Sequence, residues 1–269
     1  MIYFLLSIAL LFVIYLLLLR GRVGFADFTS FKNVSFAHRG LHGEGVPENS
    51  LWAFRRAKER GYGSELDVHL MADGNLAVIH DHSLKRIAGA DVKIEDLTLA
   101  DLDNYRLEGT DEKIPTLKQV LDLYDGKAPL IIELKATEKN ADKLCRNTAL
   151  MLKSYKGKYC IESFNPKCVH WFKKHCPQII RGQLSENFFK SKGSELPIVL
   201  KFVMTFLLTN FSTKPDFIAY KFKDRNNISF KICTKLLKMQ GFSWTVREKE
   251  IEISKKENLI PIFEEKKTV

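Results

Sequence analysis

The hydrophobic pattern of the chain starts with one long apolar run and continues as short apolar runs separated by longer amphipathic stretches. Short runs of β-branched and apolar residues are typical of buried strands. They predict strands over residues 33–37, 63–68, 130–134, 158–161, 178–182, 216–220, 242–245 and 259–263. The amphipathic stretches have their apolar residues at helical spacing. They predict helices over residues 50–60, 116–124, 139–154, 166–175 and 229–240.

The alternation of strands and helices indicates parallel strands joined by helical crossovers. Eight strands in about 240 residues favour a closed (β/α)₈ barrel over an open doubly wound sheet. The expected fold class is therefore α/β, a TIM barrel with a small insertion, preceded by one N-terminal transmembrane helix. The expected boundaries are 2–19 for the membrane anchor, 20–32 for a juxtamembrane linker and 33–269 for the barrel.

Residues 2–19 form the long apolar run, and as a helix they reach about 27 Å, enough for the hydrocarbon core of a bilayer. A cleaved signal peptide is the rival interpretation, but it needs a basic residue before the run and small residues after it. Here no Lys or Arg precedes the run, and Arg20 and Arg22 follow it. These features favour an uncleaved, single-pass anchor. A buried core helix is disfavoured because the run has no polar face.

The side of the membrane is indicated by the basic residues after the apolar run, which include Arg20, Arg22, Lys32 and Arg39. The positive-inside rule then places the domain on the cytoplasmic side. The five cysteines are scattered and lack a CxxC pair, which also favours a reducing compartment and argues against a disulfide framework or a structural zinc site.

Two stretches exceed what a simple barrel needs. Residues 81–115 form a long connection that we expect to make a small excursion over the barrel mouth, with residues 75–79 adding a short hairpin strand. Residues 197–211 are apolar on nearly every side. The favoured interpretation is a buried outer helix, and the alternative is an interfacial helix that touches lipid near the anchor.

Composition and charge exclude few classes of protein or partner. With 45% hydrophobic and 28% charged residues over 269 positions, the chain is a folded protein rather than a disordered one. The net charge of +10 lies entirely beyond the anchor and is compatible with nucleic acid, anionic lipid or a phosphate-bearing substrate. No nucleic-acid-binding motif accompanies it, so we expect no nucleic-acid partner.

Three carboxylates fall at the ends of predicted strands, where barrel enzymes build their active sites. Glu65 and Asp67 are two residues apart on one strand and therefore point to the same face, and Glu133 ends the next strand of the barrel. Converging carboxylates repel one another unless a cation neutralises them. Oxygen ligands alone suit one divalent ion, Mg²⁺ or Ca²⁺, rather than zinc.

Histidines and fixed positive charges accompany these acids. His38 and His80 are candidate proton carriers, since imidazole titrates near neutral pH. Arg39 and Lys135 add positive charge, which makes phosphoryl transfer a better interpretation than glycoside hydrolysis. Trp244 is either a flat wall for the substrate or a core aromatic residue. The other histidines are expected to be structural: His42, His69, His82, His170 and His175.

These residues belong to an ordered set of short motifs along the chain. The motifs are HRG at 38–40, PENS at 47–50, ExD at 65–67 with DG and HD downstream, IELK at 132–135, ESFNP at 162–166 and WTV at 244–246. In this order the set resembles the glycerophosphodiester phosphodiesterases. The resemblance runs from about residue 36 to 246 and through the last strand. It implies a (β/α)₈ barrel that hydrolyses a phosphodiester to an alcohol and glycerol 3-phosphate.

The resemblance also implies roles for individual residues. By motif position Glu65, Asp67 and Glu133 are similar to the ligands of one divalent metal ion, and His38 and His80 to the acid/base pair.

Further roles follow in the same way. Arg39 and Lys135 correspond to residues that hold the phosphate, Glu48 and Asn49 of PENS to supporting residues, and Trp244 to a pocket residue.

The sequence departs from the family where a TD-like ending is common, because residues 260–265 read IPIFEE. Two alternatives stay open: a phospholipase D-like hydrolase of intact or lysophospholipids in the same superfamily, and a non-catalytic membrane-anchored binding module, which the complete residue set disfavours.

Overall fold

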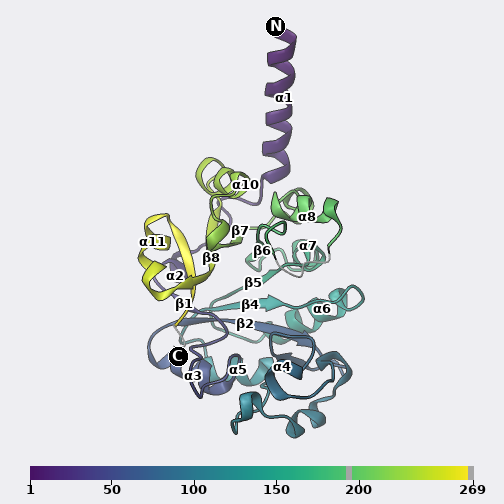
Figure 1. Cartoon of the computed structure of the whole chain (residues 1–269), viewed down its shortest axis with the longest axis vertical. Helices are drawn as coiled ribbons and strands as arrows, with labels where there is room; N and C mark the ends of the chain where they lie inside the picture. Colours follow the sequence, from purple (N-terminus) through teal and green to yellow (C-terminus); the bar gives the residue numbers. More distant parts are fainter. Residues whose placement is uncertain (192–195, 266–269) are drawn as a thin grey trace.

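Eight parallel strands close into a barrel in the computed structural model, which describes residues 1–191 and 196–265 (Figure 1). The strand order is β1-β9-β8-β7-β6-β5-β4-β2, and pairing of β1 with β2 closes the ring. The barrel strands are β1 (Phe36–Ala37), β2 (Gly63–Leu70), β4 (Leu130–Leu134), β5 (Tyr159–Ser163), β6 (Arg181–Ser185), β7 (Phe217–Lys221), β8 (Gln240–Arg247) and β9 (Leu259–Glu264). The expected barrel is confirmed. The last four residues of the predicted barrel domain, 266–269, lie outside the described residues.

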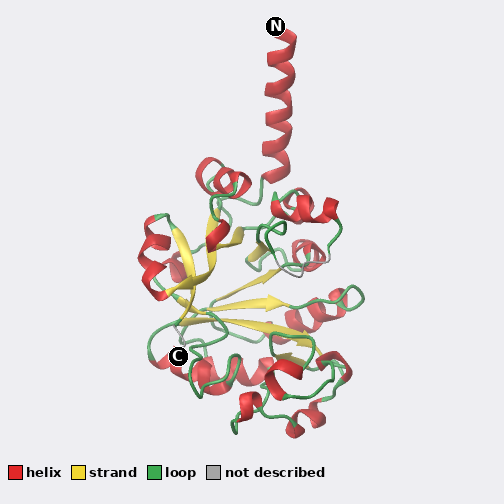
Figure 2. Ribbon diagram, viewed as in Figure 1, coloured by secondary structure: helices red, strands yellow, loops and turns green. Residues whose placement is uncertain are grey.

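Helices surround the barrel because each strand carries an apolar outer face (Figure 2). The α-helices of the outer layer are α3 (Leu51–Glu59), α5 (Leu117–Tyr124), α6 (Ala141–Leu152), α7 (Pro166–His175), α8 (Ile198–Thr205), α9 (Asn210–Thr213), α10 (Ile228–Lys231) and α11 (Ile251–Lys256). Short 3₁₀ or π turns supplement them at η4 (Phe222–Asp224), η5 (Ile232–Leu236) and η6 (Glu248–Glu250). Ser50 caps α3, since its hydroxyl accepts a hydrogen bond from the amide of Ala53.

Most predicted strands match to within a few residues, and the largest shift concerns β6. The prediction covered residues 178–182, whereas β6 runs from Arg181 to Ser185. The prediction began too early because Ile179 and Ile180 are apolar and were assigned to the strand. Ile179 instead closes a turn, in which its amide bonds the carbonyl of Cys176 at 3.0 Å, and its side chain joins the outer core.

The floor of the barrel is filled by aromatic rings. Phe31 from α2 (Thr29–Lys32) is buried and stacks on Phe36 of β1, with 5.9 Å between ring centroids. Phe217 and Phe242 complete the cluster from β7 and β8. Part of the segment 20–32, which was expected to be a linker, therefore packs on the barrel through Phe28 and Phe31. The reason is that this segment carries the rings that close the open lower end of the barrel.

The N-terminal helix α1 (Ile2–Leu19) projects away from the domain (Figure 1). It is the one helix among the described residues that is long and apolar enough to cross a membrane, with a mean hydropathy of 2.9; a signal sequence meets the same description. Only its end contacts the domain. Leu19 is fully buried, and its carbonyl accepts a hydrogen bond of 2.9 Å from Asn210 of α9.

The insertion at residues 81–115 folds beside the end of β2 on a small apolar core of its own. The expected hairpin strand is present as β3 (Leu76–Val78), antiparallel to β2. Short helices follow at α4 (Lys85–Ala88), η1 (Ile94–Asp96), η2 (Leu99–Asn104) and η3 (Leu107–Gly109).

Residues 197–211 do not form the buried outer helix that we favoured. Within them, α8 buries only Met204 and Thr205. Its apolar side chains Ile198, Val199 and Phe202 are 73%, 68% and 50% exposed. The prediction was wrong because apolar residues all round a helix were taken as evidence for burial in protein.

Candidate active site

The HRG segment turns sharply at the carboxyl end of β1. Arg39 and Gly40 both adopt the left-handed conformation, with φ of 55° and 76°. At Gly40 a Cβ atom would lie 2.9 Å from the backbone of Ala53 in α3, so only glycine fits. The turn places the backbone amide of Arg39 3.0 Å from Oε2 of Glu65 and brings His38 to the barrel mouth.

The carboxylates meet because the strands that carry them are in register. Asp67 of β2 pairs with Glu133 of β4, which pairs with Glu162 of β5. On β2, Leu66 packs outward against the helices, so Glu65 and Asp67 point to the inside of the barrel. The predicted convergence is therefore present, and Glu162 adds a fourth buried carboxylate that we had not assigned.

These side chains surround a cavity of about 200 Å³ at the mouth. The charged and titratable groups that line it are His38, Arg39, Glu65, His80, Glu133, Lys135, Glu162 and Glu264. Both candidate proton carriers therefore face the same space as the carboxylates. A cavity of this size is suited to a small polar group rather than to a whole lipid.

Two cations partly neutralise the carboxylates. Lys135 Nζ lies 2.7 Å from Glu133 and 3.1 Å from Asp67, and Arg39 Nε lies 3.5 Å from Asp67. Burial alone would raise the pKa of Asp67, but the charges of Lys135 and Arg39 outweigh burial and lower it. The same carboxylates raise the pKa of Lys135 despite its burial. Asp67, Lys135 and Arg39 are thus ionised at neutral pH.

Glu65 and Glu133 are held less firmly in the ionised form. Burial raises the pKa of Glu65 well above its usual range, and the neighbouring Asp67 and Glu133 raise it further. Burial likewise raises the pKa of Glu133 to about 7, reinforced by Asp67 and partly offset by Lys135. Four buried carboxyl groups thus face only two cations, and full ionisation of the four would leave the site with an excess of negative charge.

The excess charge and the free oxygen atoms fit a divalent cation. Ligand oxygens of Glu65, Asp67 and Glu133 all lie within 4.8 Å of one another. Buried oxygens of Glu65 and Glu162 lack a hydrogen-bond partner among the described residues, and Oδ1 of Asp67 has only its ion pair with Lys135. Unpaired buried carboxylate oxygens are costly, and a hard cation is the partner that would satisfy several of them at once.

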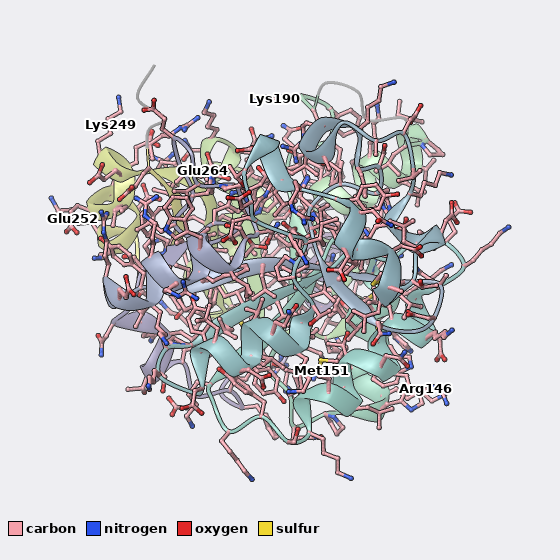
Figure 3. The ribbon with its side chains drawn as sticks, turned by 90° about the horizontal axis from the view of Figure 1, so that it is seen from below. Arg146, Met151, Lys190, Lys249, Glu252 and Glu264 are labelled. Atoms are coloured by element: carbon pink, nitrogen blue, oxygen red, sulfur yellow. The ribbon has the colours of Figure 1, made fainter. Side chains whose placement is uncertain are left out.

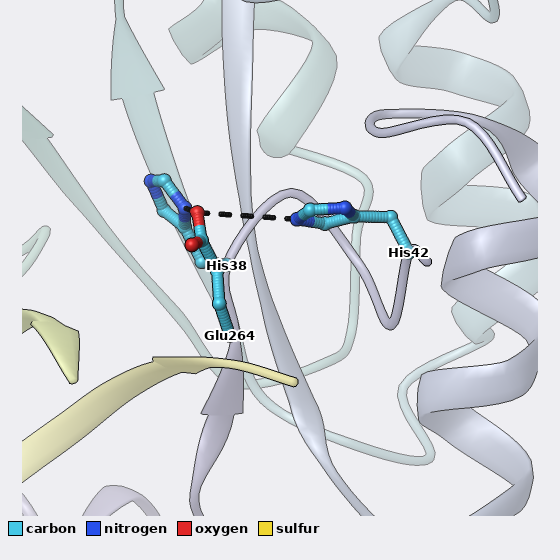
Figure 4. Close-up of side chains that lie close together, drawn as sticks. All are labelled: His38, His42 and Glu264. Carbon is cyan, nitrogen blue, oxygen red and sulfur yellow. Dashed lines mark hydrogen bonds and ion pairs between the residues drawn. The ribbon is translucent and has the colours of Figure 1, made fainter. Parts of the chain in front are cut away.

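Each candidate proton carrier is paired with a carboxylate through Nδ1. His38 Nδ1 lies 2.7 Å from Glu264 at the end of β9, and His80 Nδ1 lies 2.6 Å from Asp81. His42 approaches the same oxygen of Glu264 at 4.0 Å (Figure 4). The hydrogen bond from His38 lowers the pKa of Glu264 to about 2. A carboxylate on Nδ1 fixes the ring and leaves Nε2 free for proton transfer.

The PENS segment supports this arrangement from outside. Asn49 donates a hydrogen bond of 2.8 Å to Asp67, and Glu48 accepts one of 3.0 Å from Arg39. Arg86 of the insertion reaches both Glu48 and Asp81, each at 2.5 Å. The insertion therefore helps to position Asp81, the partner of His80.

An aromatic wall lines one side of the cavity. Trp244 is half-buried, and its ring meets Phe164 edge-on with 5.4 Å between centroids. Phe164 in turn meets Phe188, just beyond β6, at 6.2 Å. Trp244 also packs on the inner core, and its role as a wall for the substrate stays a prediction.

The remaining histidines lie outside the cavity. Glu95 of η1 accepts hydrogen bonds from His69 at 2.8 Å and His82 at 2.5 Å. His170 bonds a backbone carbonyl, and His175 packs on Trp171.

A family model settles the relationship to known proteins. The glycerophosphoryl diester phosphodiesterase family matches residues 38–259, which include the HRG segment, the carboxylate strands and the start of β9. The chain belongs to this family.

Individual relatives of this family agree with the match. A glycerophosphodiester phosphodiesterase from Caldanaerobacter subterraneus subsp. tengcongensis is 34% identical over 163 residues, covering 57% of this chain and 67% of the relative. Lysophospholipase D GDPD1 from Rattus norvegicus is 32% identical over 142 residues, covering 48% of this chain and 44% of the relative. The matched part is thus less than half the length of the rat relative.

Solved structures of the family share the barrel. A glycerophosphodiester phosphodiesterase from Parabacteroides distasonis has a TM-score of 0.67 at 26% identity, covering 91% of this chain and 93% of that chain. The enzyme from Thermotoga maritima has a TM-score of 0.64 at 26% identity, with 86% and 94% covered. An Oleispira antarctica phosphodiesterase, solved with its product sn-glycerol-3-phosphate, has a TM-score of 0.70 at 21% identity and covers 86% and 92%.

Four residues of the site were not predicted from the sequence. Asp81 and Glu162 lie inside the HD and ESFNP motifs, and their position at strand ends could have identified them. Glu264 was noted only as a departure from the family pattern, although it contacts His38. No sequence feature near Arg86 predicts its role, because its contact with Glu48 depends on how the insertion folds back.

Proposed function

We propose that the chain hydrolyses glycerophosphodiesters to an alcohol and glycerol 3-phosphate, with help from one divalent cation. The observation that carries this proposal is the shared cavity, in which two histidine–carboxylate pairs face a cluster of buried carboxylates, Arg39 and Lys135. Proton carriers on both sides of a phosphate-sized space suit general acid–base cleavage of a P–O bond.

Glu65, Asp67 and Glu133 would hold the cation, Mg²⁺ or Ca²⁺, with Glu162 close behind Glu133. When bound, the cation would supply positive charge against the phosphate oxygens. Arg39 and Lys135 would hold the phosphate from the same side, where they already contact Asp67. Asn49 would keep Asp67 in place through its hydrogen bond.

The two histidines would move the protons. One Nε2 atom would accept the proton of the attacking hydroxyl, which is either water or the neighbouring glycerol hydroxyl by way of a cyclic phosphate. The other would give a proton to the alkoxide as the P–O bond breaks. Glu264 and Asp81 would stabilise the charged form of each ring from the Nδ1 side.

A second candidate substrate is a lysophospholipid. The aromatic wall from Trp244 through Phe164 to Phe188 favours it, because such a wall offers an apolar path out of a charged cavity. One relative is named a lysophospholipase D, which agrees with this candidate.

The apolar helix α1 would be a retained membrane anchor, with the domain on the cytoplasmic side. Retention is supported by Leu19, whose buried side chain and carbonyl both contact the domain. Tyr15 also bonds Ser229 at 2.6 Å. Removal of α1 would expose the groups that these residues cover. The basic residues after α1 support the side.

The test is a metal-dependent activity assay on the full chain. Glycerophosphodiesters and lysophospholipids with a choline head group would be supplied with Mg²⁺, with Ca²⁺ or with a chelator, and glycerol 3-phosphate, lysophosphatidic acid and choline would be measured as products. We expect glycerol 3-phosphate from glycerophosphodiesters only when metal is present. Metal-independent turnover, or no turnover of any of these substrates, would overturn the proposal.

A further inference from the structure

An exposed apolar surface surrounds the base of α1. Ile198, Val199, Leu200 and Phe202 of α8 have between 46% and 73% of their surface exposed. Phe211, which follows on α9, is 59% exposed. Isolated exposed apolar residues are ordinary, but a run of this size on one helix marks an interaction site.

The contacts of α1 with the domain show where this apolar surface lies relative to the helix. The last turn of α1 contacts α9 and η5, and Leu19 belongs to a core cluster with Leu207 and Phe230. Lys214 adds a hydrogen bond of 2.9 Å to the carbonyl of Arg20. Figure 1 shows α8 and α10 on either side of the base of α1. A bilayer that holds α1 would therefore meet these helices at the level of its headgroups.

The charge around the apolar surface is complementary to anionic lipid. Residues 196–239 contain eight Lys or Arg and only two acidic residues, Asp216 and Asp224. Asp216 is buried. Lys231, Lys235 and Lys238 are exposed on the α10–η5 side. Basic residues close to an anionic leaflet are attracted to its surface charge.

We propose that α8, α9, α10 and η5 form a docking face that lies in the headgroup region of an anionic bilayer, beside α1. The apolar side chains of α8 enter the acyl boundary, and the lysines remain among the phosphates. The partner is thus a lipid surface, held against the barrel and not only against the helix.

The docking face is joined to the cavity. The amide of Phe188 bonds Thr205 of α8 at 3.0 Å, and Phe188 belongs to the aromatic wall that ends at Trp244. This step rests on the proposed function. It implies that substrate of lipid origin reaches the cavity along the membrane side of the mouth, between β6 and β7.

The experiment uses tryptophan fluorescence of the full chain in vesicles. Phe202→Trp would report from α8, and Leu99→Trp is the matched control, since Leu99 is 47% exposed in the insertion at the far end of the domain (Figure 1). Vesicles of phosphatidylcholine and phosphatidylglycerol would carry brominated acyl chains, which quench tryptophans at close range.

We expect the added emission of Phe202→Trp to be quenched at least twofold and that of Leu99→Trp to be unchanged. Equal quenching at both positions would overturn the docking face. Replacing Lys231, Lys235 and Lys238 by Gln should reduce quenching at position 202 to the level in pure phosphatidylcholine; unchanged quenching would overturn the assignment to anionic lipid. Resistance of the full chain to alkaline extraction tests separately whether α1 anchors it in the bilayer. Release of glycerol 3-phosphate tests the proposed function, independently of the docking face.

Discussion

Glu264 Oε1 lies 2.7 Å from Nδ1 of His38, although 226 residues separate the two along the chain. The contact exists because β9 pairs with β1 and closes the barrel, which brings the last strand beside the HRG turn. His80 has the same arrangement with its chain neighbour Asp81. The two candidate proton carriers are thus held in the same way, one by a residue distant in the sequence and the other by its neighbour.

Replacing Glu264 by Gln should lower kcat by about 10²-fold or more with little change in KM, because the charged form of His38 would lose its partner. The measurement is steady-state hydrolysis of a glycerophosphodiester with saturating metal. Glu264→Asp should recover part of the activity by restoring the charge.

The neighbouring Glu265 provides the control for that substitution. It forms a surface ion pair with Arg60 at 2.8 Å, so Glu265→Gln should leave kcat unchanged. In Figure 3, Glu264 lies further inside the domain than Lys249 and Glu252, which project from its edge. If both substitutions had the same effect on kcat, a specific role of Glu264 on His38 would be refuted.

Substituting His38 or His80 by Ala should each lower kcat by about 10²–10⁴-fold while the fold is preserved. Substrates with an activated leaving group, such as p-nitrophenol, should restore activity only in the variant that lacks the general acid, because that group departs without a proton. His170→Ala, at a ring that bonds the carbonyl of Ser212, is the control. Near-normal turnover in either variant would remove that histidine from the pair.

Metal affinity should rise with pH through about 7. Burial raises the pKa of Glu133 to about 7, so below that value a cation must displace its proton. Glu65, whose pKa is also raised by burial, acts in the same direction. Calorimetric titration with Mg²⁺ or Ca²⁺ between pH 5.5 and about 8.5 measures the slope. Glu133→Gln should bind more weakly with a shallower slope, and a flat profile for the unmodified chain would contradict the carboxylate site.

Phe31→Ala should destabilise the domain by about 3–5 kcal/mol, because it removes a fully buried ring from the barrel floor. Denaturant unfolding of the chain in detergent measures this. Phe25 is the control: its ring is 63% exposed and lies under Arg22, so Phe25→Ala should cost less than about 1 kcal/mol. Equal effects of the two substitutions would show that residues 20–32 are not part of the packed domain.

Local patterns were sufficient for the barrel and for much of the site. The strand β4 is an apolar run with one polar residue near its end, so both the strand and the position of Glu133 could be predicted. The spacing of Glu65 and Asp67 placed them on one face because side chains alternate along a strand.

What could not be predicted depends on contacts between distant parts of the chain. Glu264 reaches His38 only through ring closure, and Arg86 reaches Glu48 only after the insertion folds back. The exposure of α8 was misjudged for a related reason, since composition does not distinguish a helix covered by protein from one left open.

Because Leu19 is locked into the barrel wall, α1 and the catalytic domain turn as one body. As an anchor, an apolar stretch of this length would thin a thicker bilayer around it and would tilt only in a bilayer thinner than itself. Such a tilt would be passed on to the barrel. Bilayer thickness would therefore set the angle at which the mouth of this phosphodiesterase faces its surroundings.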